Sequence, residues 1–203
     1  MGLDIYLKWK GQNKKDKDNQ IIGFANKGEA GYLRSSYNDS GFNNWAKRYI
    51  SGKDFYWIFG QAGESDIAPT PEEWDTISKR ADEALQEAKK AVNMPMLIRV
   101  GGYHDVFQNE NAILRAFKEH NDRQHPDDFD WYSNHEGEFF FGKNSPTVLA
   151  VMTCKGYIGD KDIVLVCKPD EDTHKYYIDL LEKDVPAFIK LGKEKNARIV
   201  WSG

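Results

Sequence analysis

A long helical pattern near the middle of the chain is the feature that most limits the fold. Thr70-Pro71-Glu72-Glu73 combines a capping threonine, a proline at the first helical position and a glutamate three residues after the cap. Apolar residues then recur at helical spacing: Trp74, Ile77, Ala81, Ala84, Leu85, Ala88 and Ala91. The pattern predicts a helix over 70–93 that packs through its apolar side.

Strand-like segments lie on both sides of this helix. Residues 3–9 alternate with apolar side chains at odd positions, which predicts a half-buried strand. Strands are also predicted at 96–100, 138–141, 147–155, 163–168 and 198–201, and helices at 41–51, 109–120 and 172–192, the last kinked at Val185-Pro186. The order does not alternate regularly, so we expect an α+β fold with a mixed, mainly antiparallel sheet flanked by about four helices.

The segments after the first strand are less regular. The polar, lysine-rich residues 11–19 are interpreted as a solvated loop, and 21–25 as the hairpin partner of the first strand. Residues 28–31 suit a turn, 32–37 an extended segment, and 54–60 either a strand or more helix. The polar residues 61–69 are the one plausible boundary, but we expect a single domain over 1–203.

Composition narrows the class of protein. The net charge of −4 disfavours a general nucleic-acid binder, because phosphate neutralisation drives such binding. Cys154 and Cys167 each sit in an apolar strand-like run, which fits a reducing compartment and leaves a bridge between adjacent strands open. No signal peptide or membrane-spanning run is visible, so we expect a soluble cytoplasmic protein without a membrane partner.

The segment Gly31-Tyr32-Leu33-Arg34-Ser35-Ser36-Tyr37-Asn38 is the strongest candidate binding site. Arg34 offers a planar fork of donors for a carboxylate or phosphate. Ser35, Ser36 and Asn38 could hydrogen-bond an anion before a helix that Asn38-Asp39-Ser40 could cap, while Tyr32 and Tyr37 could stack on a ring. Asp4 could orient Arg34 or accept from a ligand hydroxyl. The alternative is an ordinary loop in which Arg34 forms a structural ion pair.

A second wall for the same pocket is predicted near residue 131. Trp131 offers a face for stacking, and Asn134 can pair with an amide or a base edge. The alternative is a plain turn that leads into the next strand.

Sequence patterns typical of catalytic or metal sites are weaker than the pattern of the candidate binding site. His104 and Asp105 follow a predicted strand, where a histidine could act as a general base. A loop also holds candidate metal ligands: His120, His125, His135, Asp127, Asp128 and Asp130. Their spacing matches no known metal pattern, and no nucleophile elbow, P-loop or dinucleotide fingerprint occurs. We therefore predict no metal and no cofactor.

The opening Met1-Gly2-Leu3-Asp4-Ile5-Tyr6-Leu7 and the downstream Gly31-Tyr32-Leu33-Arg34 resemble a group of uncharacterised bacterial and tailed-phage proteins. These begin with Met-Gly-Leu-Asp-(Ile/Met)-Tyr and carry a later Gly-Tyr-(Leu/Trp)-Arg segment. The resemblance covers about the first 50 residues. It implies a phage or mobile-element context, and hence the host cytoplasm, but no activity.

The leading hypothesis is non-covalent binding, or sequestration, of a small phosphorylated or nucleotide-like ligand, and the resemblance suggests phage anti-defence as its setting. Arg34 would take the anion, and Tyr37 and Trp131 would stack. Two alternatives stay open: a hydrolase or transferase that uses His104 or the His/Asp loop, and a protein-binding inhibitor or immunity-type module. Homo-oligomers are compatible with each.

Overall fold

The computed structural model describes most of the chain, namely residues 2–21, 25–36, 41–60, 66–100, 131–133, 139–141, 148–154 and 162–202. These residues form two compact units, Met1–Asn93 with Glu171–Gly203, and Met94–Asp170. The division falls at residues 93–94 and 170–171, away from the polar segment 61–69. The expected single domain over 1–203 would require the two units to pack together, and it stays a prediction.

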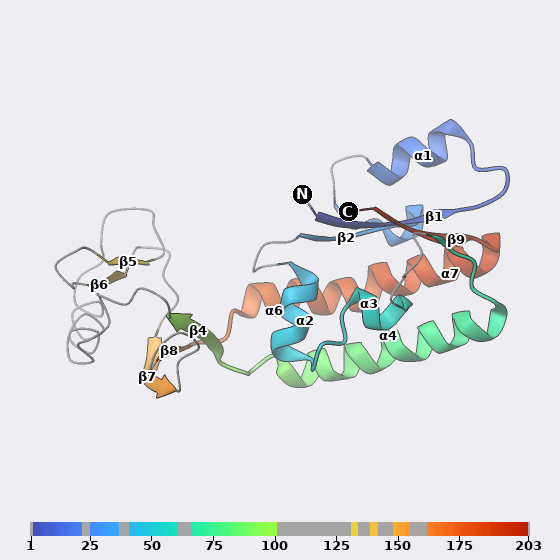
Figure 1. Cartoon of the computed structure of the whole chain (residues 1–203). Coiled ribbons are helices and arrows are strands. Elements are labelled where there is room, and N and C mark those ends of the chain that lie inside the picture. The colour runs from blue at the N-terminus through green and yellow to red at the C-terminus, as the bar shows by residue number, and fades with distance from the viewer. Residues whose placement is uncertain are drawn as a thin grey trace. The chain divides into compact units, whose positions relative to one another are not determined.

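The first unit is built on a four-stranded antiparallel sheet with the strand order β2-β1-β9-β3 (Figure 1). β1 (Gly2–Lys8) lies between β2 (Tyr32–Ser36) and β9 (Arg198–Ser202), and β3 (Asp66–Ile67) pairs with the far side of β9. The odd positions of β1 are buried, as the alternation predicts: Leu3, Ile5 and Leu7. The first and last strands of the chain therefore meet in the middle of one sheet.

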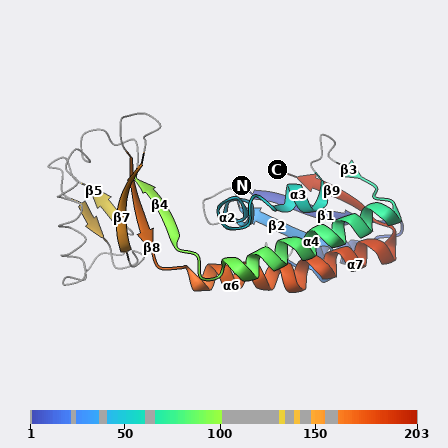
Figure 2. The same cartoon turned by 90° about the horizontal axis from the view of Figure 1, so that it is seen from below.

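Helices cover the inner face of this sheet. α4 (Pro71–Ala91) runs beside a helical rod formed by α6 (Glu171–Asp179), η3 (Leu180–Asp184) and α7 (Val185–Lys195), as Figures 1 and 2 show. The short helices α2 (Phe42–Tyr49) and α3 (Phe55–Phe59) complete a core that includes Ile5, Leu33, Trp74, Phe188 and Ile199. The predicted α+β class is confirmed.

α4 begins as its sequence predicts. The Thr70 hydroxyl accepts the N–H of Glu73 at 3.2 Å, and the Glu73 carboxylate accepts the N–H of Thr70 at 2.7 Å. This reciprocal pair satisfies two backbone donors that a helix start leaves open. The helix then buries Trp74, Ile77 and four alanines against the core.

The irregularity expected at Val185-Pro186 takes the form of a wide π turn. η3 covers Leu180–Asp184, directly before the proline. A proline lacks an N–H and its ring crowds the carbonyl four residues earlier, so a wider turn lets the helix continue. The rod ends later than expected, at Lys195, because Asn196 adopts a left-handed C-cap with φ 46°.

Two expectations about residues 11–25 are wrong. Most of the expected loop over 11–19 belongs to α1 (Lys14–Ile21), which Asn13 and Asp16 start through reciprocal hydrogen bonds of 2.9 and 3.1 Å. The first strand pairs with β2 and β9, and Ile21, which was expected to begin its hairpin partner, is the last residue of α1. α1 buries only Gln20, whose side-chain amide donates to the carbonyls of Leu7 and Gly31.

The second unit contains the remaining predicted strands. β4 (Met96–Val100), β8 (Asp162–Cys167) and β7 (Val148–Cys154) form an antiparallel sheet in the order β4-β8-β7. β5 (Trp131–Ser133) pairs with β6 (Phe139–Phe141). The predicted helix over 109–120 lies outside the described residues.

The pairing register of β7 and β8 shows whether Cys154 and Cys167 are close enough to form a disulfide. Cys154 pairs with Asp162, and Cys167 pairs with Val148 at the other end of the ladder. Five residues of β8 separate the two positions, or about 17 Å. A disulfide needs Cα atoms within about 7 Å, so these cysteines do not form one. Cys167 is a buried free thiol, and burial raises its pKa to about 11.

The contact between α7 and α4 yields a stability prediction. Gly192 packs against the Trp74 ring, and a Cβ added at Gly192 would overlap that ring. In an open helix, Gly→Ala favours folding by about 1 kcal/mol. Here overpacking dominates, so we expect Gly192→Ala to lower the free energy of unfolding by about 1–3 kcal/mol in urea denaturation.

The control is the same substitution in a Trp74→Leu background, where the smaller side chain leaves room for the new methyl group. Gly192→Ala should cost little there. A gain in stability in the wild-type background, or an equal loss in both backgrounds, contradicts the packing account.

Candidate functional site

Four side chains gather on the outer face of the sheet, the face opposite α4 and α7 (Figure 1). The register pairs Asp4 with Arg34 and Tyr6 with Tyr32, and paired residues share one face. The Tyr32 hydroxyl donates to Asp4 Oδ1 at 2.7 Å, and Arg34 Nη1 lies 3.7 Å from the same oxygen. The rings of Tyr6 and Tyr32 are 5.1 Å apart at their centroids. We call these four residues the outer-face cluster.

The cluster is partly open to solvent. The side chains of Arg34 and Asp4 are 26% and 18% exposed, whereas Tyr32 is fully buried. Burial and the hydrogen bond to Asp4 raise the pKa of Tyr32, and burial followed by the charge of Asp4 raises that of Tyr6. The hydrogen bond with Tyr32 raises the pKa of Arg34. At neutral pH the cluster therefore combines neutral phenols with a charged guanidinium.

The strand that carries Arg34 is held on its outer edge. The backbone N–H of Arg34 donates to Asn26 Oδ1 at 2.7 Å. Lys27 and Tyr32 exchange two backbone hydrogen bonds, of 2.9 and 3.0 Å. Between them Gly31 makes a tight turn with φ 78°, a conformation that suits glycine. These contacts occupy an edge that would otherwise be open, and they fix the backbone of Arg34.

Ser35 points the other way, into the protein. It is buried, and its hydroxyl accepts the N–H of Asn43 at 3.0 Å, which satisfies a donor at the start of α2. The N-cap residue of α2 is Gly41, which has no side chain that could cap the helix. Ser36 is half-buried and by alternation lies on the same face as Arg34. The Ser35 hydroxyl therefore serves the start of α2 and faces away from Arg34.

Most of the other expected site residues fall outside the part of the chain that the structure describes. Tyr37, Asn38 and Asn134 lie outside the described residues, as do His104 and the His/Asp loop except its neighbour Trp131. Trp131 begins β5 in the second unit, so the site described here comes from the first unit alone. The predicted second wall stays a prediction.

Two residues of this region, Tyr6 and Asn26, were not predicted from the sequence. Tyr6 could have been found by following the alternation of β1 beyond Asp4, because even positions share one face. Asn26 gives no such signal. Its contact with Arg34 depends on how the chain returns to the edge of β2.

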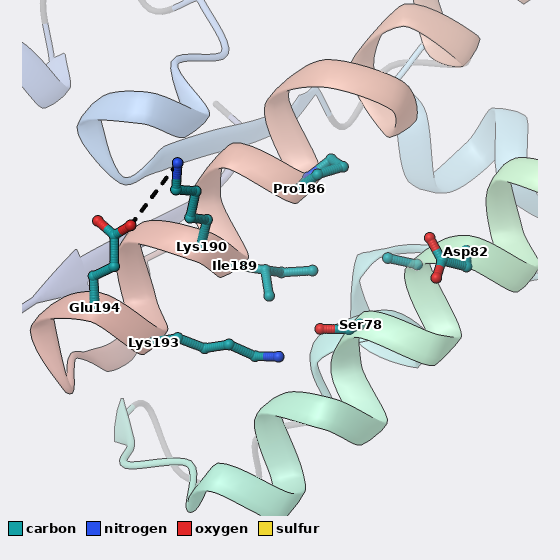
Figure 3. Close-up of a pocket in the computed structure, with 8 residues that line it drawn as sticks. Ser78, Asp82, Pro186, Ile189, Lys190, Lys193 and Glu194 are labelled. Atoms are coloured by element: carbon teal, nitrogen blue, oxygen red, sulfur yellow. Dashed lines mark ion pairs between the residues drawn. The ribbon is translucent and has the colours of Figure 1, made fainter.

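Two cavities lie elsewhere in the first unit. A groove of about 410 Å³ separates α4 from α7, with Ile189 and Lys193 pointing towards Ser78 (Figure 3). Its two lysines contact carboxylates: Lys193 lies 2.8 Å from Asp75, and Lys190 lies 3.9 Å from Glu194.

The second cavity, of about 460 Å³, is lined by α1, η2 (Gly28–Ala30), the end of α7 and Trp9. Lysines and carboxylates mix around it: Asp16, Lys27, Glu29 and Lys195. Neither cavity includes a residue of the outer-face cluster, and neither concentrates charge of one sign.

Further searches of the described residues found no group of three or more His, Cys, Asp or Glu side chains suited to a metal ion. Among the described helices, none is both long and apolar enough to cross a membrane. Comparison with known proteins gave no match to a protein-family model, a curated protein or a solved structure.

The tyrosine–aspartate bond yields a prediction about pH. Because the folded-state pKa of Tyr32 is raised, its hydroxyl contributes stability in full below the unfolded value of about 10 and loses it as pH rises through the folded value. Tyr32→Phe should therefore lower the free energy of unfolding by about 1 kcal/mol at pH 7. The difference from wild type should shrink above pH about 10.

Urea denaturation of the wild-type protein and of Tyr32→Phe, at pH 7 and again above pH about 10, measures this difference in the free energy of unfolding. Tyr176→Phe is the control, because Tyr176 is exposed on α6 and its hydroxyl bond to Asn26 is also exposed. If the loss of stability caused by Tyr32→Phe grows as pH rises, the hydrogen bond to Asp4 does not have the pH dependence that the raised pKa of Tyr32 requires.

Proposed function

We propose that the protein binds a small phosphorylated or nucleotide-like ligand, without covalent chemistry, at the outer-face cluster. One observation carries the proposal: the Arg34 side chain is 26% exposed on the outer face of the sheet and is held in place by Asp4 and Tyr32. A positioned guanidinium on a rigid strand is a common way to recognise a phosphate or carboxylate.

Pre-orientation supports the proposal energetically. A guanidinium carries five N–H donors in a planar fork, and Arg34 Nη1 lies 3.7 Å from the Asp4 carboxylate. Fixing a long side chain on binding costs about 0.5–1.5 kcal/mol, and the contacts with Asp4 and Tyr32 meet much of that cost before a ligand arrives. The backbone bond from Arg34 to Asn26 adds to this rigidity.

Tyr6 supports a ligand that has a ring as well as an anion. It is half-buried and lies two residues from Asp4 on the same face. Aromatic faces stack on nucleobases with little dependence on base identity. Ser36 lies on the same face as Arg34 and adds a polar side chain to that face.

The chemistry of the cluster favours binding over catalysis. Asp4 is the carboxylate of the cluster, and its Oδ1 atom already contacts both Tyr32 and Arg34. A general base needs an accessible acceptor that faces the substrate. The resemblance to bacterial and phage proteins extends the proposal to sequestration of a nucleotide signal in a host cell, by context alone.

The test is ligand binding by the Arg34→Ala variant. Adenosine 5′-monophosphate should raise the melting temperature of the wild-type protein, and calorimetry should give a Kd that weakens by at least about tenfold in Arg34→Ala, the scale of one charged hydrogen bond. Arg34→Lys should recover part of the affinity, since it restores the charge but not the planar fork.

Arg48→Ala is the matched control. It removes the same charge from the exposed last turn of α2, which packs on the inner side of the sheet. The proposal fails if a panel of nucleotides and inorganic phosphate leaves the wild-type protein unchanged, or if Arg34→Ala and Arg48→Ala weaken binding equally.

A further inference from the structure

We propose that the ligand carries two separate anionic groups, one recognised by Arg34 and the other by Lys8 with Arg198. The inference rests on the proposed function and names the class of ligand for the same face. It follows from the register of three adjacent strands.

The outer face carries three successive pairs of side chains. Asp4 pairs with Arg34, and Tyr6 pairs with Tyr32, across β1 and β2. Across β1 and β9, Lys8 pairs with Arg198. Since Asp4, Tyr6 and Lys8 occupy alternate positions of one strand, all three pairs face the same way. The tyrosines therefore lie between two cationic positions.

The separation of these positions sets the size of the ligand. Asp4 and Lys8 are four residues apart on β1, which is about 13 Å along an extended strand. Arg34 lies beside Asp4, so its backbone and that of Lys8 are a similar distance apart. Long side chains can lean towards Tyr6 and shorten this span. Two phosphates joined directly to each other cannot reach both cations as easily as two phosphates on opposite sides of a nucleoside.

The charges at the Lys8 end favour an anion. Lys8 is exposed, and among the described residues it forms no ion pair. Arg198 is 57% exposed and lies 2.9 Å from Asp66, whose side chain is 39% exposed. Within the described part of the chain, this end of the face therefore holds the cations Lys8 and Arg198 and the carboxylate of Asp66. A second anionic group would meet an excess positive charge there, as it meets the held guanidinium at the other end.

The class of ligand is thus a nucleoside phosphorylated at two separate positions. Its sugar or base would lie over Tyr6, with one phosphate towards Arg34 and the other towards Lys8. Lys8 would contribute as a point charge on a flexible stem, and Arg198 as a second donor.

The experiment compares three probes by calorimetry: adenosine 3′,5′-bisphosphate, adenosine 5′-diphosphate and adenosine 5′-monophosphate. The wild-type protein should bind the 3′,5′-bisphosphate about tenfold more tightly than either of the others, the scale of one added charged contact. Lys8→Gln should remove this advantage and leave the affinity for the monophosphate within about twofold, because Lys8 meets only the second anion.

Lys10→Gln is the matched control, since it removes an exposed lysine beyond the end of β1 and should leave all three affinities unchanged. The inference is overturned if the 3′,5′-bisphosphate has no advantage over the diphosphate, or if Lys8→Gln keeps that advantage. In both cases binding of the monophosphate shows that the proposed function still stands. If the wild-type protein binds none of the three, the proposed function fails and this inference fails with it.

Discussion

The pairing of β1 with both β2 and β9 is the interaction on which the first unit depends. It joins residues near the start of the chain to residues 32–36 and to the final strand, so the unit closes only when both ends of the chain are in place. The odd side chains of β1 enter the core under α4 and α7, where they meet Leu33 and Ile199. Loss of β1 would expose this apolar layer, whose burial is the main favourable contribution to folding.

The same strand supplies the outer face. Alternation sends Asp4, Tyr6 and Lys8 to the side opposite the core, so the requirements of packing and of the site do not compete for the same positions. On the neighbouring strand, Arg34 lies beside the Asp4 carboxylate, and the Tyr32 hydroxyl donates a hydrogen bond to that carboxylate. A rigid sheet is a good platform for such a cluster, because strands position side chains more reproducibly than loops do.

The sequence was informative wherever structure follows from local pattern. The cap at Thr70 and the apolar periodicity after it predicted α4, and alternation predicted β1. α1 was missed because it has no apolar side, and the residue that anchors it, Gln20, bonds to carbonyls of Leu7 and Gly31. The partners of β1 were missed because α1 separates it from β2, and because β9 lies nearly a whole chain away, so neither pairing leaves a local signal. In the candidate site, Asp4 beside Arg34 was expected, whereas the inward orientation of Ser35 and the outward one of Tyr6 needed the strand register.

Mapping the binding surface directly tests the central claim, that the outer face of the sheet is the binding site. Backbone amide shifts would be followed by NMR as adenosine 5′-monophosphate is added to the labelled protein. The account predicts saturable shifts at Asp4, Tyr6 and the residues of β2, with the amides around the α4–α7 groove unchanged. Shifts concentrated at that groove, around Ser78 and Lys193, with β1 and β2 unaffected, would contradict it.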